Sequence, residues 1–106
     1  MICTAKFYVK WQLEPSKESA DPKERGKAWL SMLEMVREDK KAGGVKDWGV
    51  AAGGEWGYSI NEAENETELF TRLLKWRPYV HFEVTPVLTV DQTIQAVKKA
   101  AASQKK

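Results

Sequence analysis

The first strand-like segment of the chain covers residues 6–13, where apolar and polar residues alternate. The apolar positions are Phe7, Val9, Trp11 and Leu13, and between them lie Lys6, Tyr8, Lys10 and Gln12. Because successive side chains of a strand point to opposite faces of a sheet, one face of this segment is apolar and the other is polar. The pattern predicts a half-buried strand whose apolar face packs on helices.

The same alternation returns in residues 79–85, near the C-terminal end. One face holds Val80, Phe82 and Val84, and the other holds Tyr79, His81, Glu83 and Thr85. We predict a second half-buried strand, which can lie beside the first with both polar faces on one side of the sheet. Pro86 has no amide proton, so within a sheet it is confined to an edge, a bulge or an end. We expect it to interrupt the strand and to leave Val87 and Leu88 as a separate edge segment.

A long helix is predicted over about residues 21–42. Asp21 is a suitable N-cap, Pro22 suits the first helical position, and Glu24 is placed to complete a capping box. The apolar residues that recur at helical spacing are Trp29, Met32, Leu33, Met35 and Val36. The glycine pair that follows ends the helix, because glycine readily adopts the left-handed conformation found after a helix C-terminus.

A second helix is predicted from Asn65, its N-cap, with Glu68 as the capping-box partner. Its apolar positions are Leu69, Phe70, Leu73, Leu74 and Trp76. Pro78 ends this helix before the last strand begins.

A short third helix is expected near the C-terminal end, with Thr89 or Asp91 as its N-cap. It carries Ile94 and Val97, and we expect residues from about 99 to 106 to form a frayed tail.

A β-hairpin is predicted from residues 45–52 and 56–61, joined by the turn at residues 53–55. Its larger apolar residues are expected to face the helices; they are Trp48, Val50, Tyr58 and Ile60. The opposite face then carries mostly small residues, namely Asp47, Gly49, Ala51, Gly57 and Ser59.

The resulting order is strand, helix, strand, strand, helix, strand, which is the pattern of the ferredoxin-like fold. We therefore predict a single α+β domain over residues 1–106, in which a four-stranded antiparallel sheet carries two helices on one face. Right-handed crossovers place the first and third strands in the middle of the sheet. The other face is bare in a single copy, and we expect the sheet of a second copy to cover it in a homodimer.

Composition narrows the class of partner. The chain has 106 residues, of which 42% are hydrophobic, and this is typical of a soluble globular domain. Four of its seventeen positive charges belong to Lys98, Lys99, Lys105 and Lys106, so residues 1–97 carry thirteen positive charges against fifteen negative. A nucleic-acid surface needs a concentrated basic stripe, and the RNA-binding domains of this fold carry a glycine-aromatic signature. Both are missing, although Tyr8 and Tyr79 offer sheet aromatics, so we predict no nucleic-acid partner.

The sequence also bears on location. It begins MICTAKFYVKW, without a basic segment followed by a long apolar run, and no stretch approaches the ~20 apolar residues that span a bilayer. The single cysteine, Cys3, cannot form an internal disulfide, which is compatible with a reducing compartment. We expect a cytoplasmic, soluble protein with no membrane partner.

Three segments give the chain a resemblance to a known group of proteins. They read KFYVKWQL, KDWGV with GYSI, and YVHFEVTPVLTV. They resemble segments of small microbial proteins of unassigned function that are similar to the muconolactone isomerase group of the dimeric α/β-barrel superfamily. The likeness covers nearly the whole chain and includes no specific catalytic motif. It implies a homodimer whose sheets face each other, with small ligands bound between sheet and helices or inside the barrel.

The polar face of the predicted sheet holds the candidate chemistry. His81 and Glu83 are two residues apart on one strand, so their Cβ atoms lie about 7 Å apart on the same face. A histidine beside a carboxylate is suited to proton transfer, because an ordinary histidine titrates near neutral pH. We take this pair as the candidate catalytic residues. The candidate ligand-binding residues are Tyr8, Lys10, Asp47, Ser59 and Tyr79.

An alternative is that these polar side chains only form hydrogen bonds across a dimer interface, in a structural or protein-interaction module. One histidine and scattered carboxylates do not make a metal site of the usual spacing, and the glycines spell no phosphate loop or dinucleotide motif. We therefore expect neither a metal nor a cofactor. The sequence predicts a homodimeric small-molecule-binding protein, whose polar sheet face would carry any isomerase-like or monooxygenase-like activity.

Overall fold

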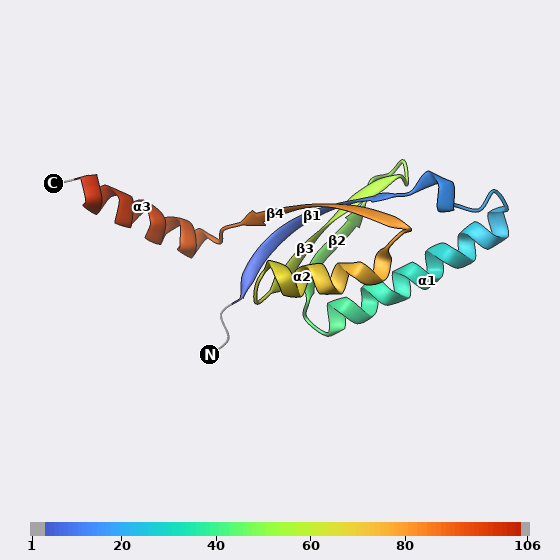
Figure 1. The fold of residues 1–106 in the computed structure, drawn as a ribbon, viewed down its shortest axis with the longest axis horizontal. Coiled ribbons are helices and arrows are strands. Elements are labelled where there is room, and N and C mark those ends of the chain that lie inside the picture. Colours follow the sequence, from blue (N-terminus) through green and yellow to red (C-terminus); the bar gives the residue numbers. More distant parts are fainter. Residues whose placement is uncertain (1–3, 105–106) are drawn as a thin grey trace.

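Figure 1 shows the computed structural model, which describes residues 4–104 of the chain. The strands are β1 (Ala5–Leu13), β2 (Val45–Val50), β3 (Trp56–Ala63) and β4 (Val80–Val87). The helices are α1 (Pro22–Lys41), α2 (Glu66–Leu73) and α3 (Val90–Gln104), and the 3-10 turns are η1 (Pro15–Lys17) and η2 (Leu74–Trp76). The order of elements confirms the predicted α+β, ferredoxin-like βαββαβ pattern followed by a C-terminal helix.

The four strands form one antiparallel sheet in the order β2-β3-β1-β4. β1 and β3 therefore lie in the middle of the sheet, as right-handed crossovers predict. Figure 1 shows α1 and α2 on the same side of this sheet, which we call the helix-covered face. No helix of the described chain covers the other side, which we call the open face.

The core lies between the helix-covered face and α2, and α1, whose apolar stripe was predicted to be buried, contributes no fully buried residue. Phe7 and Val9 of β1 are fully buried, and Trp11 is 5% exposed. Phe82 of β4 pairs with Trp11 and packs against the same cluster, which Leu69 of α2 completes. The apolar faces predicted for the first and last strands are therefore confirmed.

β3 is turned the opposite way from our prediction. The register pairs Trp11 of β1 with Gly57, and residues paired across two strands share a face. Gly57 and Ser59 are therefore buried on the helix-covered face. Tyr58 and Ile60 lie on the open face, so their predicted position against the helices is wrong. The reason is steric, because the Trp11 ring fills the space above Gly57, where a Cβ atom would lie within 3.0 Å of it.

β2 keeps the predicted faces. Trp48 pairs with Ser59 on the helix-covered face, and Asp47 lies on the open face. A register shift between Val45 and Asp47 marks a bulge, which turns Val45 toward the core as well, where it is 8% exposed. The bulge therefore places two large side chains that are three residues apart on one side of the sheet.

α1 begins and ends as predicted. The Asp21 carboxylate accepts a hydrogen bond from the backbone N–H of Lys23 at 3.1 Å. The backbone N–H of Asp21 donates to the Ser19 hydroxyl at 3.2 Å, so Ser19 takes the place that we predicted for Glu24 in a capping box. Gly43 has a φ angle of 89°, the left-handed conformation that ends the helix.

α2 has the predicted cap and a narrower apolar stripe than expected. Asn65 accepts a hydrogen bond through Oδ1 from the backbone N–H of Glu68 at 2.9 Å. Leu69 is buried, but Phe70 is 58% exposed and Leu74 is 46% exposed. These two residues were predicted to be buried, and they are exposed because α2 contacts the sheet along one row of side chains.

β4 is a continuous edge strand that runs through Pro86. Pro86 pairs with Phe7, and Val87 pairs with Lys6, so the predicted interruption and the separate segment of Val87 and Leu88 are wrong. β4 is the outermost strand, and a proline is tolerated there because no neighbour on the outer side needs its amide proton.

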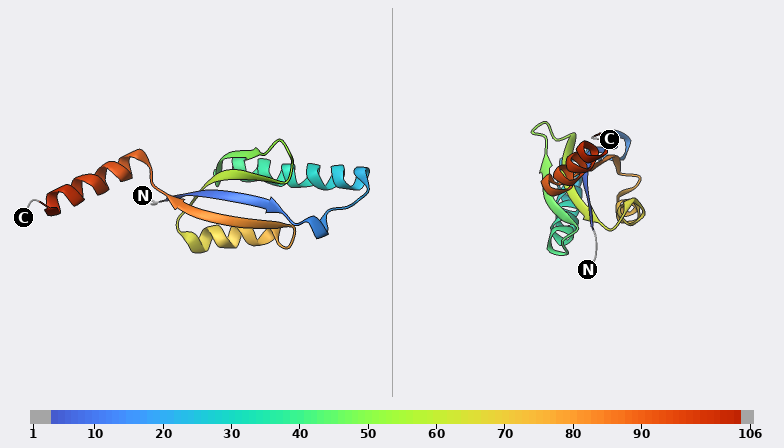
Figure 2. Two further views of the ribbon diagram at one scale, coloured as in Figure 1. Left: turned by 90° about the horizontal axis from the view of Figure 1, so that it is seen from above. Right: turned by 90° about the vertical axis from the view of Figure 1, so that its left-hand side faces the viewer.

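α3 projects away from the rest of the molecule, as Figures 1 and 2 show. The Thr89 hydroxyl accepts from the backbone N–H of Gln92 at 3.1 Å, and the Gln92 side chain accepts from the N–H of Thr89 at 2.8 Å. This capping box selects Thr89 over Asp91 as the N-cap. The helix continues to Gln104, beyond the short helix that we expected to fray from about residue 99.

The apolar stripe of α3 is exposed. Val90, Ile94 and Val97 have exposed fractions of 75%, 43% and 62%. The Cα radius of gyration is 17.5 Å, against about 13 Å for a compact domain of this length. In one copy of the chain, therefore, α3 lies apart from the core formed by the preceding elements.

Candidate functional site

The predicted catalytic pair lies on the open face, but no hydrogen bond joins its two members. His81 pairs with Gln12 of β1, and Glu83 pairs with Lys10. His81 Nε2 lies 2.7 Å from Oε1 of Glu14, so the carboxylate that contacts the histidine is Glu14 rather than Glu83. Sequence reasoning missed Glu14 because the contact depends on the register of β1 against β4, which places the end of β1 beside the start of β4.

Glu14 is held as a carboxylate by its hydrogen bonds. The bond from His81 and then those from the backbone N–H and hydroxyl of Ser16 lower the pKa of Glu14 from 4.5 to about 2. Because the His81 side chain is 55% exposed, the contact is a surface hydrogen bond at the edge of the sheet. Its clearest role is to tie the loop after β1 to β4.

The free energy of unfolding of the protein at acid pH should depend on the contact between Glu14 and His81. A carboxylate whose pKa is lowered in the folded state contributes stability above its ordinary pKa and loses that contribution as pH falls through the folded value. We therefore expect the free energy of unfolding to fall between about pH 4.5 and about pH 2, and the fall to be shallower in Glu14→Gln. The control is Glu83→Gln, because the Glu83 carboxylate forms no hydrogen bond with another described side chain. Urea unfolding curves at several pH values measure both slopes, and equal slopes for wild type and Glu14→Gln would contradict the assignment.

Three of the predicted ligand-binding residues lie on the open face among aromatic side chains. Tyr8 stacks on Tyr58 with ring centroids 6.4 Å apart, and the Tyr58 hydroxyl donates to Oδ2 of Asp47 at 3.1 Å. The bond to Asp47 raises the pKa of Tyr58. The Lys10 Nζ atom lies 5.0 Å from the centroid of the Trp56 ring. The open face therefore presents an aromatic surface, of which the sequence reasoning identified Tyr8 and missed the β3 members.

The other two predicted ligand-binding residues lie elsewhere. Ser59 is 6% exposed on the helix-covered face, where its hydroxyl donates to Oδ1 of Asn61 at 2.5 Å. Its predicted place on the open face is wrong because β3 is turned over. Tyr79 precedes β4, its side chain is 56% exposed, and its carbonyl accepts from the backbone N–H of Glu14. The predicted residues therefore do not form one site.

A cavity of about 180 Å³ lies between the helix-covered face and the helices. Its lining is mainly apolar and comes from β1, α1, β2, β3, α2, η2 and β4. The lining residues are Trp11, Leu13, Trp29, Met32, Leu33, Val36, Asp39, Ala42, Gly44, Val45, Trp48, Ser59, Asn61, Arg72, Leu73, Trp76, Val80 and Phe82. The cavity is not enclosed, and its lining includes Leu33 of α1, which is 38% exposed.

Four of the five tryptophans in the sequence line this cavity. Trp11 stacks on Trp48 with centroids 5.4 Å apart and an interplanar angle of 13°. Trp29 of α1 meets Trp11 edge-on, with centroids 6.4 Å apart, and Trp76 is contributed by η2. The walls therefore consist of flat aromatic surfaces set at different angles.

Few polar groups reach the cavity, and the buried pair Ser59 and Asn61 leaves a donor unused. The Trp11 indole N–H also has no acceptor among the described residues, but it is enclosed by protein atoms and is not exposed in the cavity. Asn61 is 5% exposed, and its amide oxygen accepts from Ser59 while its amide nitrogen forms no hydrogen bond within the described chain. Buried donors are nearly always satisfied in folded proteins, so unpaired donors on a cavity wall are suited to a ligand.

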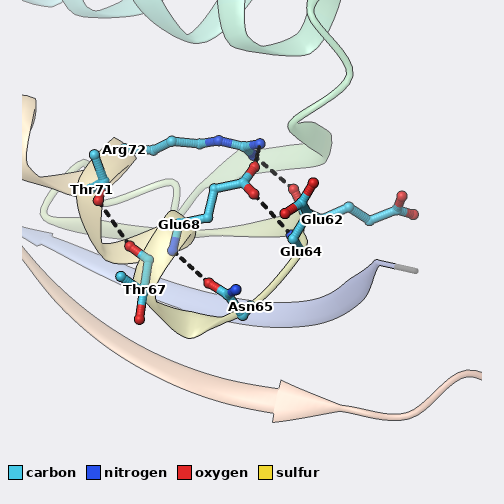
Figure 3. A network of polar contacts seen from close by, with 7 residues as sticks. All are labelled: Glu62, Glu64, Asn65, Thr67, Glu68, Thr71 and Arg72. Carbon is cyan, nitrogen blue, oxygen red and sulfur yellow. Dashed lines mark hydrogen bonds and ion pairs between the residues drawn. The ribbon is translucent and has the colours of Figure 1, made fainter. Parts of the chain in front are cut away.

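The two charged residues of the lining are already paired. Arg72 donates to the carbonyl of Glu62 at 2.7 Å and forms an ion pair with Glu68 (Figure 3). A Cβ atom at Gly44 would lie 2.7 Å from the Arg72 guanidinium, so the glycine leaves room for this side chain. Asp39 of α1 accepts from the Lys75 ammonium at 2.8 Å. Neither charge is free to neutralise a charged ligand.

Figure 3 shows how the Arg72 side chain is held in place. Glu68 receives a hydrogen bond from the backbone N–H of Glu64, while its own backbone N–H donates to Asn65. The helix cap, the acidic side chain and the guanidinium thus form one connected network at the start of α2. This network fixes the edge of the cavity between α2 and β3.

A family model described as a domain of unknown function, DUF3303, matches residues 5–101. The chain belongs to the DUF3303 family. The match includes every strand and all but the last residues of α3, so the projecting helix is part of the DUF3303 domain. No curated protein matches the chain. No solved structure matches it either.

The described part of this DUF3303 domain, residues 4–104, contains no group of three or more His, Cys, Asp or Glu side chains that could hold a metal ion. Cys3 lies outside the described residues. Within the same range, no helix combines the length and apolar character needed to cross a membrane. The polar groups among the residues that line the cavity are two paired charges, indole N–H groups, one amide and one hydroxyl.

Sequence reasoning missed the cavity of the DUF3303 domain although a signal was present. Five tryptophans in 106 residues are many, and we placed four of them, Trp11, Trp29, Trp48 and Trp76, at apolar positions of the predicted strands and helices. Tryptophan is large and is rarely buried completely, so several of them on one side of a thin domain leave gaps between their rings. The signal was their number, while their convergence depends on the packing of α1 and η2.

Proposed function

We propose that this DUF3303 domain is a homodimeric protein that binds a small molecule in the tryptophan-lined cavity. The observation that carries the proposal is the cavity itself, which is mainly apolar, is open to solvent and is lined by the buried polar pair Ser59 and Asn61. Ligand pockets typically combine apolar walls with a few placed polar groups. The likeness to the muconolactone isomerase group is compatible with this location, since it implies ligands either between sheet and helices or inside the barrel.

Two exposed apolar surfaces support the homodimer. The open face carries Tyr8, Tyr58 and Trp56, the last of them 43% exposed, without a covering element in the described chain. The apolar stripe of α3 is the second surface. Closed two-fold dimers are the commonest oligomers, and a second copy would bury both surfaces. The cytoplasmic location, and the absence of nucleic-acid and membrane partners, remain parts of this proposal.

A thermal-shift screen tests the binding function. A ligand that binds only the folded protein stabilises it by about 2.7 kcal/mol at a hundred times its dissociation constant. We expect compounds from a library of small one-ring and two-ring molecules to raise the melting temperature. The absence of any hit, together with side chains that fill the cavity in a crystal structure, would instead support the structural or protein-interaction module.

Chemistry on the open face is a separate hypothesis, in which His81 transfers a proton in an isomerase-like or monooxygenase-like reaction. If ligands bind in the cavity alone, His81→Asn should leave their dissociation constants within about twofold of wild type, because His81 lies on the other face of the sheet. Calorimetric titration of any hit from the screen measures this. A loss of tenfold or more in His81→Asn, with an unchanged affinity in Tyr79→Phe, would move the ligand site to the open face.

A further inference from the structure

We propose that the cavity takes an uncharged ligand built on a single aromatic ring with one hydrogen-bond acceptor. This inference rests on the proposed binding function and adds the chemical class of the ligand. It is carried by the size of the cavity, the arrangement of its tryptophans, its unpaired donors and its paired charges.

The size of the cavity limits the ligand to about one ring. Its volume is about 180 Å³. An apolar cavity of about 150 Å³ in another protein holds benzene, whereas sites for drug-sized molecules occupy roughly 300–1,000 Å³. A benzene ring with a substituent of two or three heavy atoms therefore fits inside, and a fused two-ring compound with a substituent would have to extend out of the opening.

The walls favour a flat aromatic ring over an aliphatic one. Trp11 and Trp48 are nearly parallel, and Trp29 meets Trp11 edge-on at an interplanar angle of 66°. Aromatic rings prefer offset stacking and edge-to-face contacts, because the face of one ring is negative and the edge of another is positive. A ligand ring in this cavity meets both kinds of surface.

The polar side chains that line the cavity favour a ligand that has a hydrogen-bond acceptor. Ser59 and Asn61 bond to each other, and in either orientation of the amide at least one N–H or O–H of the pair remains unused. Both side chains line the cavity and are more than nine-tenths buried. A carbonyl or ether oxygen on the ligand satisfies such a donor, while a purely apolar ligand leaves it unpaired.

The charges at the cavity exclude an ionised ligand. The Arg72 guanidinium is engaged by Glu68 and by the Glu62 carbonyl, and Asp39 is engaged by Lys75. A carboxylate ligand would lose its hydration without gaining a free cation, and burying an unpaired charge is strongly unfavourable. The ligand is therefore neutral at working pH.

Four probe compounds test the size, the acceptor and the charge of the ligand by calorimetric titration of the full chain. Acetophenone has one ring and a carbonyl, ethylbenzene has a similar shape without an acceptor, benzoate adds a charge, and 1-acetylnaphthalene adds a second ring. We expect acetophenone to bind roughly tenfold more tightly than ethylbenzene, the factor that one hydrogen bond to a buried donor provides. Benzoate and 1-acetylnaphthalene should bind at least tenfold more weakly than acetophenone.

A double variant locates the effect. Ser59→Ala with Asn61→Leu removes both polar partners at once and keeps their approximate volume, a change that is often nearly neutral for stability. In this variant acetophenone and ethylbenzene should bind equally well. Trp56→Phe on the open face is the matched control and should keep the preference of the wild type. If the double variant does not fold, the comparison of the four probes on the wild-type protein still decides the inference.

The outcomes separate the ligand class from the binding function. If some compounds in a broad screen bind but ethylbenzene equals acetophenone, or if benzoate or 1-acetylnaphthalene binds best, the ligand class is wrong and the binding function stands. If no compound binds at all, the binding function itself has failed.

Discussion

Two substitutions in α3, Ile94→Asp and Val97→Asp made together, are expected to convert a dimer of about twice the 12.1 kDa chain mass into a monomer. Both side chains belong to the exposed apolar stripe of a helix that projects from the domain. A separate helix of about 15 residues is only marginally stable in water, so the packing of this stripe on a second copy would stabilise α3. Light scattering at micromolar concentration measures the mass.

The size of the expected effect follows from the apolar surface that Ile94 and Val97 would bury in the dimer. Fully burying a valine or isoleucine side chain contributes about 1.5–3 kcal/mol, and the dimer would lose four such side chains, two from each copy. The upper limit is therefore roughly 6–12 kcal/mol, and even half of the lower figure would weaken association more than a hundredfold.

The control for the α3 variant uses the same helix. Gln95→Asp with Ala96→Asp adds the same charge to adjacent exposed positions outside the stripe, so it should remain dimeric. A wild-type protein that scatters as a monomer would refute the homodimer, and a variant that stays dimeric would restrict the interface to the open face.

The fold could be predicted from the sequence because its signals are local. The alternation of Phe7, Val9 and Trp11 fixes the face of β1 without any knowledge of its neighbours. Asp21 and Asn65 mark the starts of α1 and α2 because a side-chain oxygen satisfies a free amide in the first turn. Each of these features involves residues only a few positions apart.

The orientation of β3 could not be predicted, because it is decided by packing between strands. The apolar character of Tyr58 and Ile60 points to the core, while the register turns Gly57 and Ser59 inward. The small residues make room for the Trp11 ring, which is large enough to cover its neighbour on β3. A strand in which both faces contain apolar residues specifies its orientation only through its partners.

The candidate site was missed for the same reason. His81 and Glu83 share a face, as period two requires, yet Glu14 is the residue that contacts His81. The cavity depends on α1 and η2, which bring Trp29 and Trp76 to the same space from distant parts of the sequence. Contacts between residues so far apart in the sequence can be identified only from the three-dimensional structure.

Gly57→Ala adds a single methyl group, and we expect it to lower the free energy of unfolding of the domain strongly. The added Cβ atom would lie within 3.0 Å of both the Gly49 carbonyl oxygen and the Trp11 ring. A neighbouring strand's backbone cannot move aside as a flexible side chain can, so the strands must separate or the ring must leave its place. Overpacking of this kind typically costs 1–3 kcal/mol, and the backbone clash puts this case at about 3 kcal/mol or more.

The expected loss is a large part of the stability of a small domain, which is about 5–15 kcal/mol. Urea unfolding measures it, and near-ultraviolet circular dichroism reports the stacked pair of Trp11 and Trp48. Gly53→Ala is the matched control, because no atom lies within 4 Å of the Cβ position there, and surface changes of this kind stay within about 0.5 kcal/mol.

Since Trp11 forms a wall of the cavity, Gly57→Ala should also weaken acetophenone binding, whereas Gly53→Ala should not. If Gly57→Ala keeps both its stability and its tryptophan signal, Trp11 does not lie over Gly57, and the cavity that depends on this packing is wrongly placed.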